Sequence, residues 1–265
     1  MATQVASRKA LLHVAVTSCF CIAIVSTGLF DNVATELGYA HYAERPVPGL
    51  PALIAMPFNC LINLAYMVMG VYWLCHDDVA QRQGQASLYI KNVFASMAIV
   101  YGPVQWFRLW SMTHSSAVVD QWFTLPIFAW VPVWCHSILH GWSLEMAITI
   151  EGLSLTSYGM ALAHSQGFEL ALGCHILAAA WGGLQVQQKH GDSTSRTYMG
   201  LALVSCFGFV VFKLLDHYLA HWIFFQRLTG HFWSKVCDVL QYHYSLRFLT
   251  YVDSRPRQAI KNKTR

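Results

Sequence analysis

The sequence has few charged residues and no segment that would divide it. Only 11% of its residues are Asp, Glu, Lys or Arg and 55% are hydrophobic, whereas soluble domains carry about 25% charged residues. This balance excludes an ordinary soluble domain. We find no Gly/Ser linker, low-complexity tract or internal repeat, so the 265 residues are expected to form one membrane-embedded domain. The formal net charge of +4 is modest and indicates no nucleic-acid partner.

Cysteine is absent from the segments expected to face an oxidising compartment. All eight cysteines fall within apolar stretches, which argues against a disulfide framework. No spacing of Cys and His is typical of a structural zinc finger. We therefore expect the cysteines to pack within helices.

Long apolar runs are abundant. They lie at residues 11–30, 52–75, 89–110, 117–139, 142–163, 168–187, 198–221 and 230–252. Each has about the 20 residues that a transmembrane helix needs. Glu145 and Glu151 dilute the fifth run, and Pro126 and Pro132 predict a kink in the fourth. The sequence thus predicts an all-α, multi-pass transmembrane helical bundle of eight spans.

The basic residues predict how this bundle is oriented. Eight spans place both termini on one side, and most of the seventeen Lys and Arg residues fall in loops or tails on that side. The opposite loops contain Arg45 and Arg227. The positive-inside rule then places both termini in the cytosol. We divide the chain into an N-terminal anchor helix with an extracytosolic loop (1–51), a seven-helix membrane core (52–252) and a basic cytosolic tail (253–265).

Both ends of the chain contain short segments that resemble sorting signals. Ser26-Thr27-Gly28 resembles a signal-peptide cleavage site, but the run before it is longer than a signal-peptide core, which favours a retained anchor. Lys261 and Lys263 have the pattern of a di-lysine retrieval signal, which coat-protein machinery reads on the cytosolic side. That signal predicts residence in the endoplasmic reticulum or early secretory pathway. The alternative is a merely basic juxtamembrane tail.

The topology gives the intramembrane polar residues a common depth, in the extracytosolic third of their spans. Ionisable side chains there are costly and indicate a functional site. The candidate polar pocket consists of Asn59, Asn63, Arg108, Asp120, Asp216, His231, Lys235 and Asp238. The last three are spaced i, i+4 and i+7, and so share one face of the final helix. Snorkelling or capping explains any one residue alone, but agreement among five spans predicts a shared pocket.

The order of these positions resembles a superfamily of membrane hydrolases that includes alkaline ceramidases and the progestin and adipoQ receptors. The resemblance rests on Asn59 and Asn63, Val104 to Arg108, Asp120, Leu215-Asp216 and His231 to Lys235. It covers residues 52–252 and implies a seven-helix ceramidase-like core preceded by one N-terminal helix. In that superfamily three histidines hold a zinc ion whose bound water attacks an amide.

The residues at the matching metal positions differ from that pattern. They are Arg108, His231 and Lys235, so one histidine of three remains. Arginine does not lose its proton in a protein, and lysine binds metal only if its pKa falls strongly. Arg108 and Lys235 would instead balance carboxylates that a missing cation leaves unpaired. We therefore expect no metal or other cofactor, and predict a metal-free, salt-bridged pocket.

A second arrangement of histidines leaves a metal site open as an alternative. His217 and His221 are four residues apart, and His231 follows across a short loop, which is acceptable spacing for a three-histidine zinc site. Capping or solvent-facing histidines explain the same pattern without a metal.

Longer runs resemble a vertebrate family of multi-pass proteins. GLPALIAMPFN from Gly49, YGPVQWFRLW from Tyr101, DQWFTLPIFAW from Asp120 and LTGHFWSKVCDVLQ from Leu228 are similar to the transmembrane protein 187 family. This resemblance implies a membrane location and specifies no reaction. One function open to the chain is that of a non-catalytic lipid-binding or scaffold protein, a pseudoenzyme with a degenerate zinc site. The alternative is a metal-dependent lipid amidase or esterase with an altered histidine site. Membrane lipids are the expected partners in both.

Overall fold

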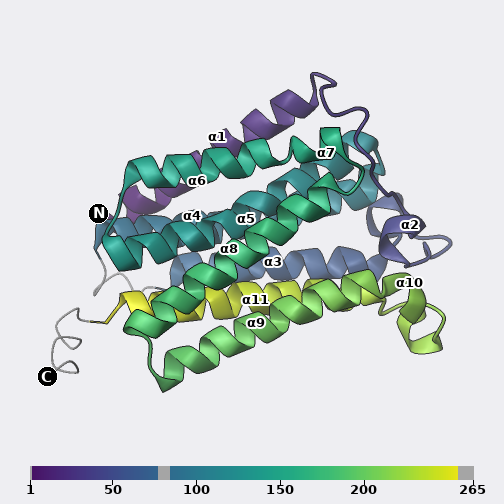
Figure 1. Cartoon of the computed structure of the whole chain (residues 1–265). Helices are drawn as coiled ribbons and strands as arrows, with labels where there is room; N and C mark the ends of the chain where they lie inside the picture. The colour runs from purple at the N-terminus through teal and green to yellow at the C-terminus, as the bar shows by residue number, and fades with distance from the viewer. Residues whose placement is uncertain (1, 77–83, 256–265) are drawn as a thin grey trace, which may run out of the picture.

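Each apolar run contains a long helix in the computed structural model, which describes residues 2–76 and 84–255. The long helices are α1 (Ala2–Val25), α3 (Pro57–Cys75), α4 (Gln85–Ser111), α5 (His114–His140), α6 (Leu144–Ser157), α8 (Gly167–His190), α9 (Ser193–Leu214) and α11 (Gly230–Asp253). Short helices between them are α2 (Tyr39–Tyr42), α7 (Met160–Ala163) and α10 (Asp216–Leu219), with 3-10 turns at Ala52–Ile54 and Ile223–Gln226. These described residues contain no strand, so the predicted all-α class is confirmed (Figure 1). Lys261 and Lys263 lie outside the described residues, and the retrieval signal stays a prediction.

Side chains at the helix starts explain several boundaries. Thr113, Ser143 and Thr229 begin α5, α6 and α11, and each accepts a hydrogen bond from a backbone N–H three residues on. Asp192 begins α9 in a capping box with Ser195. Because this cap precedes the apolar run, α9 begins five residues before the predicted residue 198.

Length and composition distinguish the helices. Among the described residues, five helices are long and apolar enough to cross a membrane, namely α1, α3, α5, α8 and α9. α4 and α11 are as long but carry more polar residues, many of them buried. α6 has 14 residues, about 21 Å, and a turn at Tyr158 and Gly159 separates it from α7. The diluted fifth run is therefore two helices, and the count of eight spans stays a prediction. α5 continues through both Pro126 and Pro132.

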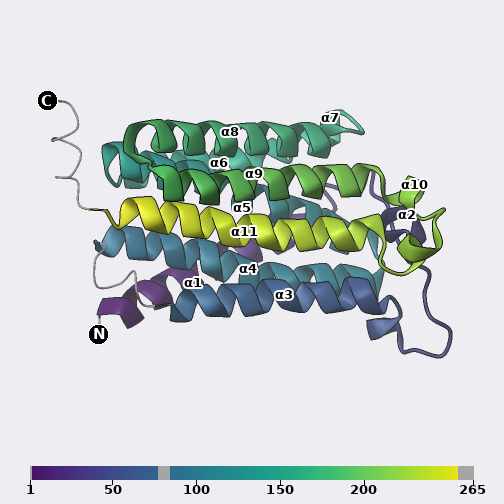
Figure 2. The ribbon, with the colours of Figure 1, turned by 90° about the horizontal axis from the view of Figure 1, so that it is seen from below.

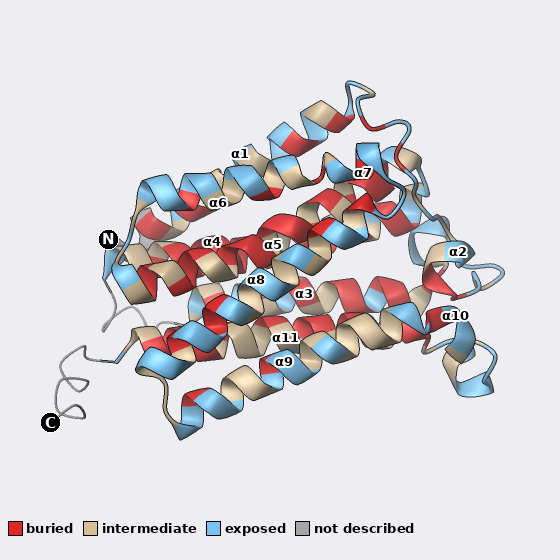
Figure 3. Ribbon diagram, viewed as in Figure 1, coloured by how far each residue is buried: buried red, intermediate tan, exposed pale blue. Residues whose placement is uncertain are grey.

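α4 and α5 lie at the centre of the bundle, as the concentration of buried residues in Figure 3 shows. The largest buried cluster includes Trp73 of α3, Phe94 of α4, Trp130 of α5 and Leu249 of α11. α9 packs along α11, and α3 packs along α4 (Figure 2). In contrast, only 11% of the apolar span of α9 and 22% of that of α8 are buried. Exposed apolar faces of this size are suited to contact with lipid.

The two ends of the bundle differ in what they carry. The start of α1 and the end of α11 lie at one end, and α2 and α10 lie at the other (Figures 1 and 2). We call the second the loop end, and it comprises residues 31–56 and 215–229. If the number of spans is even, the first span must begin on the side of the membrane where the last span ends, as α1 and α11 do here. The side of the membrane that this end faces stays a prediction.

A polar contact half-way along α1 joins this helix to the bundle. Nε2 of His13 lies 2.8 Å from both carboxylate oxygens of Glu151 on α6, and Nδ1 lies 2.6 Å from the hydroxyl of Tyr89 on α4. The Thr17 hydroxyl donates to Glu151 at 3.2 Å, and the Trp130 ring packs edge-on against His13. Polar contacts between helices bind them together where lipid surrounds both. α1 is thus packed as part of the fold, and its retention in the mature protein stays a prediction.

The contact predicts a loss of stability when Glu151 is neutralised. Glu151→Gln keeps the shape of the side chain but removes the charge that His13 faces, so we expect a loss of about 1.5–3 kcal/mol, the usual contribution of a hydrogen bond to a charged group. Thermal unfolding of the purified protein in detergent measures it. Glu145→Gln is the matched control, because Glu145 is an exposed carboxylate on the same helix. Equal unfolding temperatures for the two variants would contradict the prediction.

Candidate functional site

An ion pair joins the end of α4 to the start of α5 at the loop end. Nη1 of Arg108 lies 2.7 Å from Oδ2 of Asp120, and the two side chains are 2% and 9% exposed. Nη2 of Arg108 donates to the carbonyl of Glu36 at 2.7 Å, and the guanidinium lies 6.0 Å from the centre of the Tyr42 ring. Met112 ends α4 in a left-handed conformation, φ 48°, which lets α5 begin two residues later. This short connection brings the two charges together.

Lys235 of α11 lies between two tyrosines. Its Nζ is 3.4 Å from the Tyr101 hydroxyl, and 5.2 and 5.9 Å from the ring centres of Tyr101 and Tyr66. Tyr66 donates to Oδ2 of Asp238 at 2.5 Å, and the Tyr101 hydroxyl is 2.8 Å from that of Thr124. Cation–π contacts of this kind stabilise an ammonium group that is removed from water. The ammonium group is thus held by the aromatic faces of Tyr66 on α3 and Tyr101 on α4 and by the Tyr101 hydroxyl.

His231 occupies the first turn of α11. Its backbone N–H donates to Oδ1 of Asp216 at 2.8 Å, and its Nδ1 lies 3.0 Å from Nζ of Lys213 on α9. Lys213 also donates to the carbonyl of His41 at 2.8 Å. The rings of His41 and Tyr42 pack edge-on against the His231 ring, with centres 4.9 and 4.8 Å away. α2 therefore covers the ends of α9 and α11.

Glu44 is a completely buried acidic residue that the sequence did not single out. Its carboxylate accepts hydrogen bonds from the Asn59 side chain at 2.7 Å, the Asn59 N–H at 3.1 Å and the Phe58 N–H at 3.4 Å. A carboxylate at the start of a helix is stabilised by the unpaired N–H groups there. Burial still raises the pKa of Glu44, although the hydrogen bonds from Asn59 and Phe58 lower it. The residue anchors the loop to the start of α3.

Five of the eight predicted residues line one small cavity of about 10 Å³, namely Asn59, Asn63, Asp120, His231 and Lys235. Tyr42, Gln105 and Leu109 complete its lining. α4 comes close to α3 here because Gly102 has no side chain: a Cβ on it would lie 2.7 Å from the Asn63 carbonyl oxygen. A volume of this size corresponds to about one water molecule. The cluster is therefore closely packed.

Three carboxylates balance the three cations of this cluster. The cations are Arg108, Lys213 and Lys235, and the carboxylates are Asp120, Asp216 and Asp238. The fourth acidic member, Glu44, is held instead by N–H groups of Phe58 and Asn59. Besides the Arg108–Asp120 pair, Lys213 interacts electrostatically with Asp216, and Lys235 does so with both Asp120 and Asp238. A buried charge without a partner costs on the order of several kcal/mol. Loss of any one of these side chains would leave such a charge.

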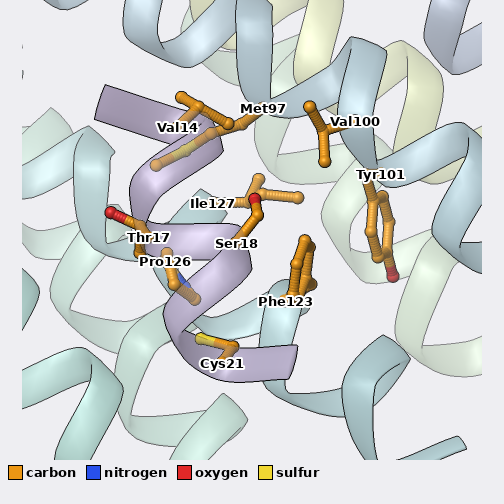
Figure 4. Close-up of a pocket in the computed structure, with 10 residues that line it drawn as sticks. All are labelled: Val14, Thr17, Ser18, Cys21, Met97, Val100, Tyr101, Phe123, Pro126 and Ile127. Carbon is orange, nitrogen blue, oxygen red and sulfur yellow. The ribbon is translucent and has the colours of Figure 1, made fainter. Parts of the chain in front are cut away.

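Tyr101 separates the polar cluster from an apolar cavity under α1. This cavity of about 30 Å³ is lined from α1 by Val14, Thr17, Ser18 and Cys21, from α4 by Met97, Val100 and Tyr101, and from α5 by Phe123, Pro126 and Ile127 (Figure 4). The Tyr101 ring lines the cavity, whereas its hydroxyl reaches Thr124 and Lys235 on the polar side. The Tyr101 side chain thus separates the polar cluster from the apolar cavity.

The structure brings all eight predicted pocket residues into one connected cluster at the loop end. Seven further members of the cluster were not predicted, and they are His41, Tyr42, Glu44, Tyr66, Tyr101, Gln105 and Lys213. A signal for two of them was present in the sequence. Tyr66 shares a helix face with Asn59 and Asn63, and Tyr101 shares one with Arg108.

The structure does not bring His217, His221 and His231 together around a metal position. Nε2 of His217 lies 2.7 Å from the carbonyl oxygen of Ala40, and Nδ1 of the exposed His221 lies 3.0 Å from that of Tyr218. His231 is buried beside Lys213. Among residues 2–76 and 84–255 no group of three or more His, Cys, Asp or Glu side chains is placed to hold a metal ion. The donors at the ceramidase-like positions do not fit zinc either, since Arg108 and Lys235 are cations.

Comparison with known proteins identifies the relatives of this chain. The family model described as the TMEM187 protein family matches residues 10–250. The chain belongs to the TMEM187 protein family. Transmembrane protein 187 of Bos taurus is 54% identical over 247 residues, which cover 92% of this chain and 96% of that protein. Transmembrane protein 187 of Homo sapiens is 53% identical over 249 residues, 94% of each. Membership of the TMEM187 family confirms the predicted resemblance and the integral membrane location.

No solved structure matches the chain. The distant likeness to ceramidases and progestin receptors therefore stays a prediction that rests on the order of the polar residues.

The Arg108–Asp120 pair predicts a non-additive pattern of mutations. Arg108→Met or Asp120→Leu alone should cost about 3–5 kcal/mol of stability, because each leaves an unpaired buried charge. The double variant should cost less than the sum, since two apolar side chains can replace a buried pair. Unfolding in detergent measures this cycle. The same cycle on Arg255 and Asp192, an ion pair 42% and 23% exposed, is the control. Its interaction energy should be about 0–1 kcal/mol, although Asp192→Leu alone also removes the cap of α9. Additive losses at Arg108 and Asp120 would contradict the prediction.

Asp216 predicts a pH dependence of stability. Burial raises the pKa of its carboxyl from 3.8 to about 6, against the hydrogen bonds from His231 and Gly230 and the Lys213 charge, which lower it. The folded protein therefore holds this proton more tightly than the unfolded chain. The contribution of Asp216 to stability is greatest below about pH 4 and falls as the pH rises through about 6.

Comparison with Asp216→Asn, which does not titrate, isolates this contribution. Thermal unfolding of both proteins should show the wild type losing stability relative to the variant across that pH range. A constant difference, or one that grows in favour of the wild type with rising pH, would refute the assignment.

Proposed function

We propose that the chain is a non-catalytic, lipid-embedded scaffold protein in which a charge-balanced polar cluster stands where related hydrolases would hold zinc. The observation that carries this proposal is the Arg108–Asp120 ion pair, 2.7 Å long and buried beside His231 and Lys235. A permanently charged guanidinium next to the position of a divalent cation repels that cation. The pair neutralises the carboxylate without a metal.

The chemistry of the neighbouring side chains supports the same proposal. A hydrolytic zinc site needs three neutral or anionic ligands and an open position for water. His231 is the one ligand of this type at the matched positions, and its Nδ1 already faces Lys213 at 3.0 Å. The cavity of about 10 Å³ has no room for the amide or ester group of a lipid. A scaffold role fits such a closed cluster better than turnover of a substrate.

The contacts of the cluster support a structural task. Its side chains come from α3, α4, α5, α9 and α11 and from the segment that contains α2. Apolar helices in lipid have no hydrophobic force that drives them together, so packing and polar contacts decide how they associate. The cluster supplies such contacts at the loop end. The exposed apolar surfaces of α8 and α9 contact the membrane lipids.

Metal analysis and a hydrolysis assay on the same preparation test the proposal. Protein purified without added metal should contain far less than one zinc per chain, and should not release fatty acid from N-acyl sphingoid or acyl ester lipids. Near-stoichiometric zinc together with hydrolysis that a chelator stops would establish the alternative, a metal-dependent amidase or esterase. The variant His231→Ala should then lose both the zinc and the activity.

A gain of metal in a designed variant tests the proposed relation to a zinc site. Arg108→His combined with Lys235→His supplies three histidines at the matched positions. If these positions correspond to a metal site, the folded double variant should bind one zinc that the wild type does not bind. Arg108→Gln combined with Lys235→Gln, which removes the same two charges without adding imidazoles, is the control and should bind none. Failure of the folded site variant to bind zinc would reject the relation while leaving the scaffold proposal in place.

A further inference from the structure

The turn between α9 and α11 exposes large apolar side chains beyond the end of the bundle. This turn, residues 216–229, contains α10 and the 3-10 turn Ile223–Gln226 and projects at the loop end (Figures 1 and 2). Ile223 is 88% exposed, Tyr218 65%, Trp222 62% and Phe224 57%. Large apolar side chains gathered at one tip indicate an interaction surface.

The exposed tip continues the lipid-facing surface of α9. On that helix Val204 and Phe207 are each 70% exposed and Leu214 is 78% exposed. They lie on the side of α9 turned away from α11, against which α9 packs. Their spacing follows the helix repeat and leads along the chain into Tyr218 and Trp222. A line of exposed apolar side chains therefore runs from α9 to the tip of the turn, with the exposed His217 and His221 beside it.

The turn carries positive charge and no acidic residue after its first position. From His217 to Thr229 the sequence contains Arg227 and two histidines but neither Asp nor Glu. The single acidic residue, Asp216, is buried and accepts the His231 N–H. An apolar and aromatic tip beside a cationic side chain complements the boundary between acyl chains and phosphate groups.

Hydrogen bonds on both sides of the tip fix its position. Nε2 of His217 lies 2.7 Å from the carbonyl oxygen of Ala40, and Nη1 of Arg227 donates to the carbonyl of Arg45 at 3.0 Å. The Tyr39 ring packs edge-on against His217, with centres 5.6 Å apart. The apolar side chains between these two attachments are thus presented outward by a tethered turn.

We propose that residues 216–229 form an interfacial anchor in the lipid leaflet at the loop end. Trp222, Ile223 and Phe224 lie among the upper acyl chains, and Arg227 lies at the level of the lipid phosphates. The chain thereby has a monotopic attachment in addition to its spans. The anchor fixes the depth of the loop end in the membrane. It thereby also fixes the position of residues 36–45, which cover the polar cluster.

Spin-label accessibility in vesicles tests this placement. Ile223→Cys is labelled with a nitroxide in a full-length chain whose native cysteines are replaced, and the protein is reconstituted into phosphatidylcholine vesicles. Collisions with oxygen, which concentrates in the bilayer, are compared with collisions with a water-soluble nickel chelate. Phe207→Cys, on the exposed apolar side of α9, is the reference inside the bilayer. Thr194→Cys, exposed at the far end of α9, is the aqueous reference.

The label at 223 should show an oxygen-to-nickel ratio severalfold above that of the Thr194 site and below that of the Phe207 site, because the interface lies between the two depths. A ratio equal to the Thr194 value would overturn the proposal. That outcome is also the one expected if the turn awaits a protein partner, because the vesicles contain the purified chain alone.

A second measurement avoids replacement of the cysteines. Trp222→Phe in the otherwise unchanged chain removes one tryptophan, so the difference from the wild type reports the fluorescence of Trp222. Lipids brominated near the headgroup end of their chains should quench this difference signal more strongly than aqueous iodide does. Stronger quenching by iodide would reject the interfacial position, whatever the outcome with the spin label.

Discussion

The Arg108–Asp120 ion pair, buried at the loop end, is the contact on which the arrangement of the other polar groups depends. Both side chains are buried away from water, so each needs the other. Once they pair, α4 and α5 are fixed at that end. The second guanidinium nitrogen then reaches the carbonyl of Glu36 and draws the preceding loop over the helices. Lys213 and Lys235 require the same compensation and obtain it from Asp216, Asp238 and two tyrosine rings.

A common device attaches the loop to the helices: carbonyl groups of residues 36–45 accept hydrogen bonds from side chains with cationic or imidazole nitrogens. The pairs are Glu36 with Arg108, Ala40 with His217, His41 with Lys213, and Arg45 with Arg227. Backbone carbonyls satisfy such donors without adding negative charge, so the charge balance of the cluster is preserved. The buried Glu44 carboxylate completes the attachment at the start of α3. The loop thus covers the cluster, whereas the sequence alone had predicted only an extracytosolic loop after the first helix.

The sequence predicts those cluster residues that lie on one helix face, because their spacing repeats. It does not predict contacts between residues of different segments. Three helices repeat one spacing, i, i+4 and i+7: Asn59, Asn63 and Tyr66 on α3, Tyr101, Gln105 and Arg108 on α4, and His231, Lys235 and Asp238 on α11. Helix geometry turns this spacing into a polar face, so the pocket was predictable. Glu44 was not, because a loop has no repeat. Nor was the contact of His13 with Glu151, whose residues are 138 positions apart and meet only through tertiary packing. The apolar runs predicted the helices, whereas the break after α6 followed from local turn geometry at Tyr158 and Gly159.

A cluster of paired charges favours one arrangement of helices in a membrane protein, which an apolar core does not do. Apolar side chains can often replace a buried ion pair without loss of stability, so stability alone does not explain such residues. In lipid, however, apolar helix faces are as well solvated by acyl chains as by one another, and they specify few contacts. Arg108 and Lys235 find their carboxylate, hydroxyl and aromatic partners in this arrangement of α3, α4, α5 and α11, and a different packing of these helices would separate them. The cluster therefore selects that arrangement among alternatives of similar packing energy, which is the property that a scaffold requires and that a metal centre would otherwise supply.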